Sequence, residues 1–134
     1  MNPKLLTISG YRGIVDQTFT TEVVEKLITA FGQLLKTLTP KNNQVLICRD
    51  GRPGGKKYLD QVVTILTNNN FDVLNADILP TPLAFFAVKK FGLAGAVIIT
   101  ASHNPIEYNG LKFVGSDGLF ISADNIREIK KLIS

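Results

Sequence analysis

An apolar run in this sequence ends in a small polar cluster. The segment Gly95–Pro105 has the sequence GAVIITASHNP, in which aliphatic residues typical of a buried strand lead directly to hydroxyl, imidazole and amide side chains. Pro105 fixes its own φ and biases Asn104 away from helical geometry, which favours a rigid, open turn. A serine presented on such a turn, as Ser102 would be, can act as a nucleophile. The same residues also fit a turn in which Ser102 and Asn104 only satisfy backbone amides.

Two further residues close to Ser102 in the sequence could move protons or balance charge. His103 is the only histidine of the chain, and Lys112 follows the tight turn that Asn109 and Gly110 begin. A lone histidine is also a common structural residue. An exposed strand lysine would give the same pattern as Lys112, so neither residue decides the chemistry by itself.

A second polar loop, Arg49–Lys56, has the sequence RDGRPGGK and stands between an apolar run and an amphipathic segment. Phosphate-binding loops occupy such places, but GxxxxGK[ST] needs a longer glycine spacing and a hydroxyl where Lys57 stands. An Asp-Gly turn leading into a helix explains the same residues. Asp50 and Arg52 could pair and stiffen this loop.

Composition limits the class of protein that could hold these loops. The 134 residues, 45% hydrophobic and 19% charged, suit one globular domain with a sizeable core. The formal net charge of +4 suits anionic small molecules, but it is too thinly spread to indicate nucleic-acid binding. An ordinary basic surface explains this charge equally well.

The single cysteine and the absence of long apolar runs bear on the compartment. Cys48 lies inside an apolar run, so the chain alone can form neither a disulfide framework nor a zinc cluster. A reducing, cytoplasmic setting is therefore expected. The first residues do not form a signal peptide, and nowhere do eighteen apolar residues follow one another. We expect neither secretion nor membrane association.

Strands and helices must alternate to position the loops. The expected strands, the first of them a short strand or extended entry, cover 5–9, 44–48, 71–79, 94–100 and 111–114. The expected helices have apolar stripes over 23–38, 58–66, 83–91 and 126–133, the first capped by Thr20 or Thr21 and the last by Ser122. These elements predict an α/β domain with a mainly parallel or mixed sheet of about four strands, covered by helices on both faces. In such sheets, loops at the carboxyl ends of the strands gather in one crevice.

Several stretches together resemble the α-D-phosphohexomutase family, which includes phosphoglucomutases and phosphomannomutases. The motifs in question are SG-x-RG at Ser9–Gly13, RD-x-R at Arg49–Arg52 and PTP after Leu79. Thr100–Pro105, followed by Glu107–Gly110 and Lys112, is similar to the phosphoserine signature of the family. The resemblance covers essentially the whole chain and corresponds to the first of the four domains that the family normally has.

This resemblance implies a chemistry. Ser102 would be phosphorylated and would give its phosphoryl group to a hydroxyl of a hexose phosphate. The resulting bisphosphate would reorient and return its other phosphate to Ser102. Mg²⁺ would bind an oxygen of the phosphoserine, and hexose 1,6-bisphosphate would be the activator.

The resemblance also implies roles for the surrounding residues. Lys112 and Arg12 become the candidates for proton transfer and charge stabilisation, with His103 assisting. An arginine stays cationic in proteins, so we expect Arg12 to act electrostatically. The support residues for the loop or the substrate are Asn104, Asn109, Asp50 and Arg52.

Motifs of the other three domains do not occur in these 134 residues. They comprise an aspartate-rich DGDGDR-like metal loop, a sugar-binding loop and a C-terminal phosphate-binding loop. We therefore expect residues 1–134 to be the N-terminal domain of a mutase, inactive alone, whose partners are hexose phosphates and the remaining domains. The alternative is a stand-alone, non-catalytic binding or regulatory module. An excised domain should expose an apolar patch, whereas an evolved module should not.

The sugar preference rests on a few residues of the signature. Thr100 and the segment Glu107–Lys112 look more like the phosphomannomutase and phosphoglucomutase branch than like the phosphoglucosamine mutases, which often begin this signature with serine.

Overall fold

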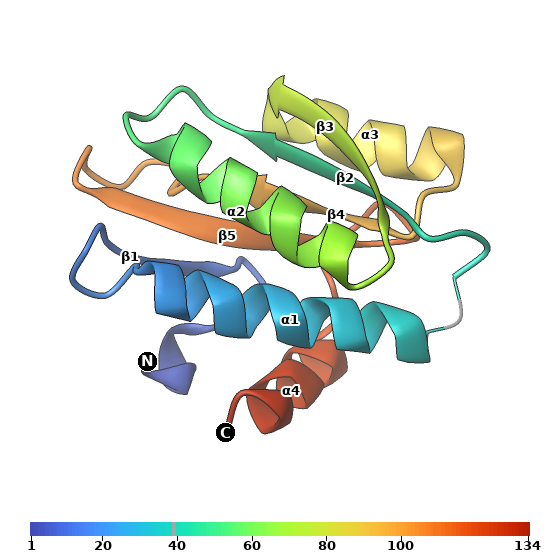
Figure 1. Cartoon of the computed structure of the whole chain (residues 1–134), viewed down its shortest axis with the longest axis horizontal. Coiled ribbons are helices and arrows are strands. Elements are labelled where there is room, and N and C mark those ends of the chain that lie inside the picture. The colour runs from blue at the N-terminus through green and yellow to red at the C-terminus, as the bar shows by residue number, and fades with distance from the viewer. Residues whose placement is uncertain (39) are drawn as a thin grey trace.

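The computed structural model describes residues 1–38 and 40–134 and contains one mixed sheet of five strands (Figure 1). The strands are β1 (Tyr11–Ile14), β2 (Gln44–Arg49), β3 (Asp72–Ile78), β4 (Gly95–Ile99) and β5 (Tyr108–Gly115). They lie in the order β1-β5-β4-β2-β3. The pairs β2–β3 and β2–β4 are parallel, and β5 is antiparallel to both β4 and β1. The expected mixed α/β class is confirmed, with one strand more than the expected four.

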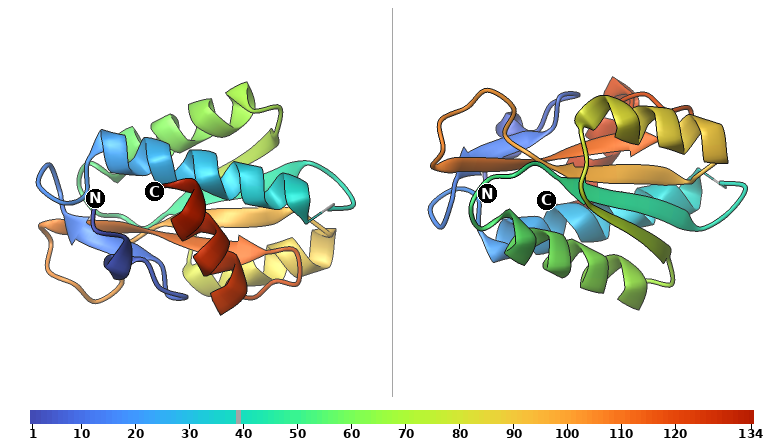
Figure 2. Two further views of the ribbon diagram at one scale, coloured as in Figure 1. Left: turned by 90° about the horizontal axis from the view of Figure 1, so that it is seen from below. Right: turned by 90° about the horizontal axis from the view of Figure 1, so that it is seen from above.

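Helices cover both faces of the sheet, as expected. They are α1 (Thr21–Thr37), α2 (Gly55–Asn68), α3 (Thr81–Phe91) and α4 (Ala123–Leu132), preceded by a short 3₁₀ helix at Pro3–Leu5. Helices α1 and α2 lie on one face and α3 on the other, while α4 lies beside α1 (Figure 2). Within the described residues, none of the helices combines the length and apolar character that crossing a membrane requires.

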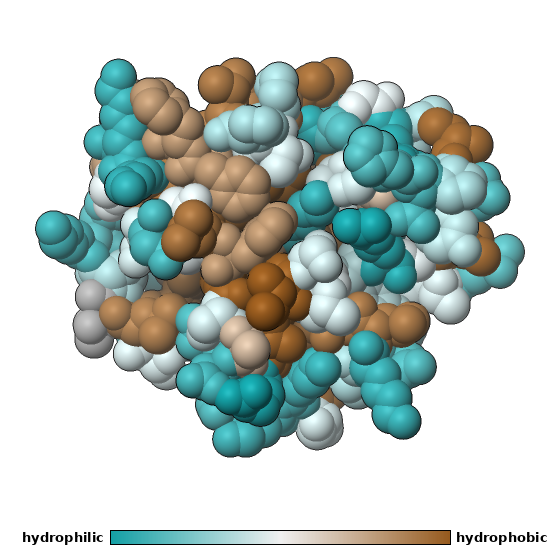
Figure 3. All heavy atoms as spheres, turned by 180° about the vertical axis from the view of Figure 1, so that it is seen from behind, coloured by the Kyte–Doolittle hydropathy of each residue, from teal (hydrophilic) through white to brown (hydrophobic). Residues whose placement is uncertain are grey.

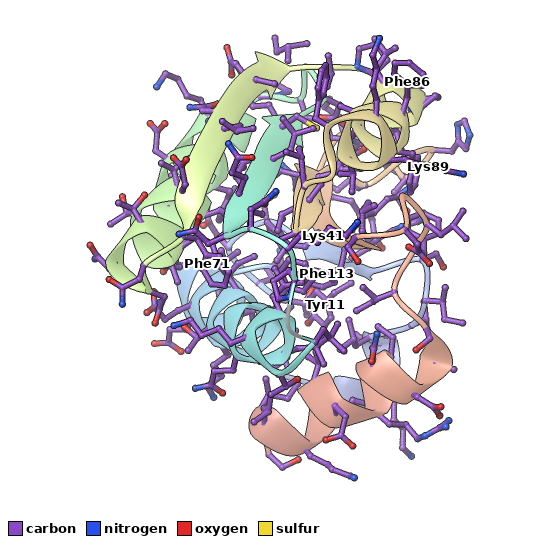
Figure 4. All side chains as sticks on the ribbon, turned by 90° about the vertical axis from the view of Figure 1, so that its right-hand side faces the viewer. Tyr11, Lys41, Phe71, Phe86, Lys89 and Phe113 are labelled. Carbon is purple, nitrogen blue, oxygen red and sulfur yellow. The ribbon has the colours of Figure 1, made fainter. Side chains whose placement is uncertain are left out.

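Strand alternation divides the interior into two cores. Val45 and Ile47 of β2 face α1 and α2, whereas Leu46 and Cys48 face α3. The larger core includes Phe113 (Figure 4). The ring centroid of Phe113 lies 4.8 Å from that of Phe31 on α1. The smaller core contains the free thiol of Cys48, and burial raises the pKa of this thiol to about 12. Cys48 is therefore a packing residue and carries no thiolate chemistry at neutral pH.

The sequence predicted the bounds of most of these helices and strands to within a few residues. Thr20 caps α1, because its Oγ1 accepts a hydrogen bond from the Val23 amide at 3.3 Å. Ser122 caps α4 by accepting from the Asn125 amide at 3.1 Å. Helix α3 begins at Thr81, two residues before the expected start, because Pro82 is accommodated in a first helical turn.

Residues 5–9, expected as a short strand or an extended entry, do not form a strand. Residues Pro3–Leu5 form a 3₁₀ turn, in which the Asn2 side chain accepts a hydrogen bond from the Lys4 amide at 3.0 Å. The strand begins at Tyr11, whose side chain is buried and whose hydroxyl donates to the Thr18 carbonyl at 2.9 Å. The SG-x-RG motif consequently lies partly on a strand and contributes Arg12 from β1.

Two apolar residues at helix ends also differ from the expectation. Leu38 is 46% exposed and Leu132 is 48% exposed, although both belong to stripes expected to face inward. Each lies at or just beyond the last helical turn, where the helix no longer covers the core. Ile126 and Ile129 of α4 are buried as expected.

Gly110 is required where β1, β5 and the end of β4 meet. A Cβ atom at this position would lie 2.4 Å from the Tyr11 carbonyl oxygen and 2.7 Å from that of Thr100. Gly110→Ala is therefore expected to lower the free energy of unfolding by about 2–3 kcal/mol, since backbone atoms must move to admit the methyl group. The measurement is the urea midpoint of the purified chain.

Gly51→Ala is the matched control, because a Cβ atom at Gly51 would meet nothing within 4 Å. We expect it to stay within about 1 kcal/mol of the parent. Equal urea midpoints for the two variants would contradict the close approach at Gly110.

Candidate active site

The candidate residues gather at the edge of the sheet where β2 and β4 end. These strands are parallel, so the loops that follow them, which begin at Asp50 and Thr100, lie side by side. Thr100 Oγ1 donates a 2.6 Å hydrogen bond to Asp50 Oδ2. The antiparallel neighbours β5 and β1 bring Lys112 and Arg12 to the same region.

The Arg52 side chain holds the Ser102 loop by hydrogen bonds to backbone carbonyl groups of the loop. Its side chain is only 11% exposed, and its Nε lies 3.3 Å from Asp50 Oδ2. The two Nη atoms donate to the carbonyl oxygens of Ser102 (2.8 Å), Asn104 (2.7 Å), Pro105 (2.7 Å) and Tyr108 (3.1 Å). One guanidinium group thus satisfies four carbonyl groups of a tight loop. The ion pair with Asp50 that the sequence suggested is present.

Ser102 is half-buried and adopts an uncommon backbone conformation. Its φ is +54°, in the left-handed region that residues other than glycine seldom occupy. The Ser102 amide donates to Thr100 Oγ1 at 3.0 Å, and the Asn104 amide donates to the Ala101 carbonyl at 3.0 Å. The sequence predicted a rigid, open turn at Asn104 and Pro105, and the structure shows a turn closed by the hydrogen bond from Asn104 to Ala101. Strain of the kind seen at Ser102 is typical of functional loops.

Two cations lie on the side of the sheet opposite to α1 and α2. Arg12 of β1 pairs with Gly110 of β5, and Lys112 lies two residues further along β5, so both side chains project from the same face. Arg12 Nη1 donates to Asn104 Oδ1 at 3.0 Å, which ties this cation to the Ser102 loop. Lys112 Nζ lies 5.7 Å from the centroid of the Phe120 ring.

The environment of Lys112 favours its neutral amine more than water would. Burial lowers the pKa of Lys112, and the nearby Arg12 cation lowers it further. The Asp50 carboxylate acts on this pKa in the opposite direction, with a smaller effect. Lys112 can therefore lose a proton more readily than a surface lysine, which suits a group that accepts a proton during a reaction.

The two remaining candidates differ from this cluster in exposure. His103 is exposed, and its ring makes no hydrogen bond within the described residues. Asn109 is 1% exposed and lies on the opposite face of β5 from Lys112, under the first turn of α2 beside Gly55. Its Oδ1 accepts from the Gly110 amide at 2.9 Å, while its Nδ2 has no partner among the described residues.

The sequence did not indicate two features of the site. Thr100 bridges Asp50 and Ser102, although its side chain entered the sequence analysis only as a marker of subfamily. Arg12 also lines a surface hollow of about 260 Å³ together with Thr7 and Ser9. Ser9 of the SG-x-RG motif lines this hollow, so the motif could have indicated it.

The described residues form no cluster of possible metal ligands. Across residues 1–38 and 40–134, no three His, Cys, Asp or Glu side chains come together in a way that could hold a metal ion. The carboxylate nearest to Ser102 among the candidates, that of Asp50, is already engaged by Thr100 and Arg52.

Apolar side chains remain exposed on the side of the molecule that carries α3 (Figure 3). Phe86 is 60% exposed and, with Phe85 and Gly118, lines a hollow of about 320 Å³ that two lysines flank. Phe86 and Lys89 both project from α3 (Figure 4). The described part of the chain thus exposes the kind of apolar patch that was expected of a domain with missing neighbours.

Comparison with known proteins decides the family. The family model described as phosphoglucomutase/phosphomannomutase, alpha/beta/alpha domain I, matches residues 4–134. The chain belongs to this family. Its domain I is 41% identical over 129 residues to a phosphoglucosamine/phosphogalactosamine mutase of Sulfurisphaera tokodaii. It is 35% identical over 129 residues to a phosphoglucomutase/phosphomannomutase of Thermococcus kodakarensis.

The matches are confined to one part of each relative. The aligned region covers 96% of this domain I but only 28% of each of these two relatives. A solved structure of a phosphoglucomutase/phosphomannomutase family protein from Burkholderia thailandensis superposes with a TM-score of 0.85 at 27% identity. It matches 99% of this chain and 30% of that one. The relatives carry the names of both sugar branches, so the branch suggested by Thr100 stays a prediction.

Proposed function

We propose that the chain is the phosphoserine-bearing domain of a mutase that interconverts hexose 1-phosphate and hexose 6-phosphate through a bisphosphate intermediate. One observation carries this proposal: Ser102 stands on a strained, clamped turn at a strand end, and Arg12 is hydrogen-bonded to Asn104 of the same turn. The sequence similarity to mutases supports it, as does the exposed apolar patch. The strained conformation of Ser102 favours this proposal over a stand-alone binding module, because strain of this kind is typical of catalytic loops.

The proposed transfer starts from a phosphate on Ser102. A hydroxyl oxygen of the sugar phosphate attacks phosphorus, a new P–O bond to the sugar forms, and the bond between phosphorus and Ser102 Oγ breaks. The electron pair of the broken bond stays on Ser102 Oγ. Lys112, as the neutral amine, receives the proton of the attacking hydroxyl, and the resulting ammonium group gives a proton to Ser102 Oγ, which restores the serine hydroxyl. Arg12 balances the negative charge on the phosphoryl oxygens, and His103 at the rim assists. The reverse sequence returns the other phosphate of the bisphosphate to Ser102.

The Mg²⁺ that the family resemblance implies would find only part of its ligands here. Ser102 would supply one phosphate oxygen once it is phosphorylated, and Mg²⁺ requires an octahedral set of oxygen ligands. The other protein ligands would have to come from outside this chain. When bound, the ion would neutralise phosphate charge.

The remaining parts of the proposal concern activation and compartment. Hexose 1,6-bisphosphate would phosphorylate Ser102 and so activate the enzyme. A reducing cytoplasm suits the single, buried free thiol of Cys48.

Lys112 provides the test of this function. In the complete mutase, Lys112→Met should lower turnover by about 10²–10⁴-fold, because the attacking hydroxyl loses its base. The Michaelis constant for hexose 1-phosphate should change far less, since the methionine leaves sugar contacts in place. Steady-state kinetics in both directions measure the two constants.

Lys131→Met is the matched control. Lys131 lies on the exposed side of α4 and pairs only with Glu128 of the same helix. We expect its turnover to equal that of the parent. An unchanged turnover number in Lys112→Met would remove this lysine from the chemistry.

A further inference from the structure

Thr100 occupies a buried position between the two loops of the site. It directly follows β4, its residue is 5% exposed, and it precedes Ser102 by two residues. A threonine at such a place needs partners for its hydroxyl, because a buried polar group without a hydrogen bond is destabilising.

The Thr100 hydroxyl makes two hydrogen bonds that fix its direction. Its single proton is donated to Asp50 Oδ2 over 2.6 Å, a short distance typical of a hydrogen bond to a carboxylate. The lone pairs then point elsewhere, and one of them accepts the Ser102 amide at 3.0 Å. The carboxylate polarises the hydroxyl and makes it a stronger acceptor for that amide.

Asp50 is connected to the other side of Ser102 as well. Its Oδ1 accepts the Arg52 amide at 3.0 Å, and its Oδ2 lies 3.3 Å from Arg52 Nε. Arg52 Nη2 in turn donates to the Ser102 carbonyl at 2.8 Å. The two peptide groups that flank the Ser102 Cα are therefore both linked to the Asp50 carboxylate. The peptide group before Cα is linked through Thr100, and the one after it through Arg52.

This double connection holds Ser102 in its left-handed conformation. A non-glycine residue at φ +54° is less stable by about 1–2 kcal/mol than in an ordinary conformation, so it needs contacts that impose it. The backbone conformation fixes the direction of the Cα–Cβ bond and so limits the positions that Oγ can occupy. A relaxed loop would move this bond and displace Oγ.

We propose that Thr100 is a positioning residue for phosphoryl transfer, which keeps Ser102 in its left-handed conformation by linking the Ser102 amide to the Asp50 carboxylate. This inference rests on the proposed mutase function of Ser102. Thr100 touches no reacting atom and acts through the Ser102 backbone.

Two substitutions in the complete mutase separate positioning from packing. Thr100→Val keeps the shape of the side chain and removes the hydroxyl, whereas Thr100→Ser keeps the hydroxyl and removes a methyl group. We expect Thr100→Val to lower turnover by about tenfold to a hundredfold, the effect of an ångström-scale misplacement of a reacting group. Thr100→Ser should stay within about threefold of the parent, because the hydrogen bonds to Asp50 and Ser102 can re-form.

The control readouts are the Michaelis constant for hexose 1-phosphate and the melting temperature. The Michaelis constant should change less than turnover in Thr100→Val, since Thr100 contacts no sugar. If Thr100 only packed, Thr100→Ser would be more damaging than Thr100→Val, because serine lacks the buried methyl group. If Thr100→Val is unfolded at the assay temperature, Thr100→Cys replaces it, since a thiol bonds only weakly.

Parental turnover in folded Thr100→Val, or a lower turnover in Thr100→Ser than in Thr100→Val, overturns the positioning role. Ser102→Ala is assayed in parallel to separate this inference from the function on which it rests. Full activity of Ser102→Ala refutes the proposed function. Loss of activity in Ser102→Ala with full activity in Thr100→Val refutes only the role of Thr100.

Discussion

Replacement of Ser102 by alanine is expected to abolish phosphoryl transfer in the complete mutase that we propose. Alanine offers no oxygen to carry the phosphoryl group, and the neighbouring hydroxyl of Thr100 is buried and bonded to Asp50. The loss should exceed about 10³-fold in turnover, as expected for removal of a covalent nucleophile. Steady-state kinetics give the loss, and mass spectrometry of the peptide that contains residue 102 tests for a bound phosphoryl group after incubation with hexose 1,6-bisphosphate.

A second variant separates chemistry from backbone strain. Ser102→Gly also removes the hydroxyl, but glycine adopts a positive φ without penalty, so this variant should be more stable than Ser102→Ala by about 1 kcal/mol. Both should be inactive. Ser116→Ala, at an exposed turn after β5, should keep parental activity and phosphorylation. Substantial turnover in either Ser102 variant, or phosphate found on another serine, would contradict the assignment.

Replacement of Arg52 by lysine is expected to cause the largest loss of order in the site. Lysine keeps the positive charge but has one nitrogen, which cannot reach the four carbonyl groups and the carboxylate that the guanidinium group contacts. Carbonyl groups left unsatisfied in a tight loop should lower the free energy of unfolding by about 2–3 kcal/mol. Urea unfolding measures this loss, and amide hydrogen exchange over residues 102–108 shows where it arises.

Arg127→Lys provides the matched control. Arg127 lies on the exposed side of α4 and pairs with Asp124 one turn away, so its replacement should change stability by less than about 0.5 kcal/mol. Equal stability of Arg52→Lys and the parent, with unchanged amide exchange in the loop, would show that the loop holds its shape without the guanidinium group. The turnover of Arg52→Lys in the complete mutase is expected to be lower than that of the parent, because Ser102 would be misplaced, as in Thr100→Val.

Sequence patterns predicted the elements whose signals are local. The cap at Thr20 and the apolar stripe that follows it determine α1, and the aliphatic run before Thr100 determines β4. The strand at Tyr11–Ile14 lacked such a signal, because it is short and is stabilised by pairing with residues about a hundred positions away on β5. Non-local pairing of this kind leaves no periodic trace in a four-residue segment.

Within the site, residue types were easier to predict than contacts. Arg52 was expected to pair with Asp50, but its four carbonyl partners lie fifty or more residues away and are backbone groups, which no side-chain motif marks. The position of Asn109 could have been inferred. Residues three apart on a strand face opposite sides, so Asn109 and Lys112 cannot both project toward Ser102.

The amide of Ser102 is engaged by Thr100, so a phosphate on Ser102 would be denied its nearest backbone donor. Many anion sites stabilise charge with rigid backbone amides, which hold the anion tightly. The negative charge would instead be balanced by the long side chain of Arg12. A resting phosphate held less tightly leaves more easily, because catalysis depends on binding the transition state better than the ground state. The phosphoenzyme would then be close in free energy to the sugar bisphosphate, and the reaction could run in either direction.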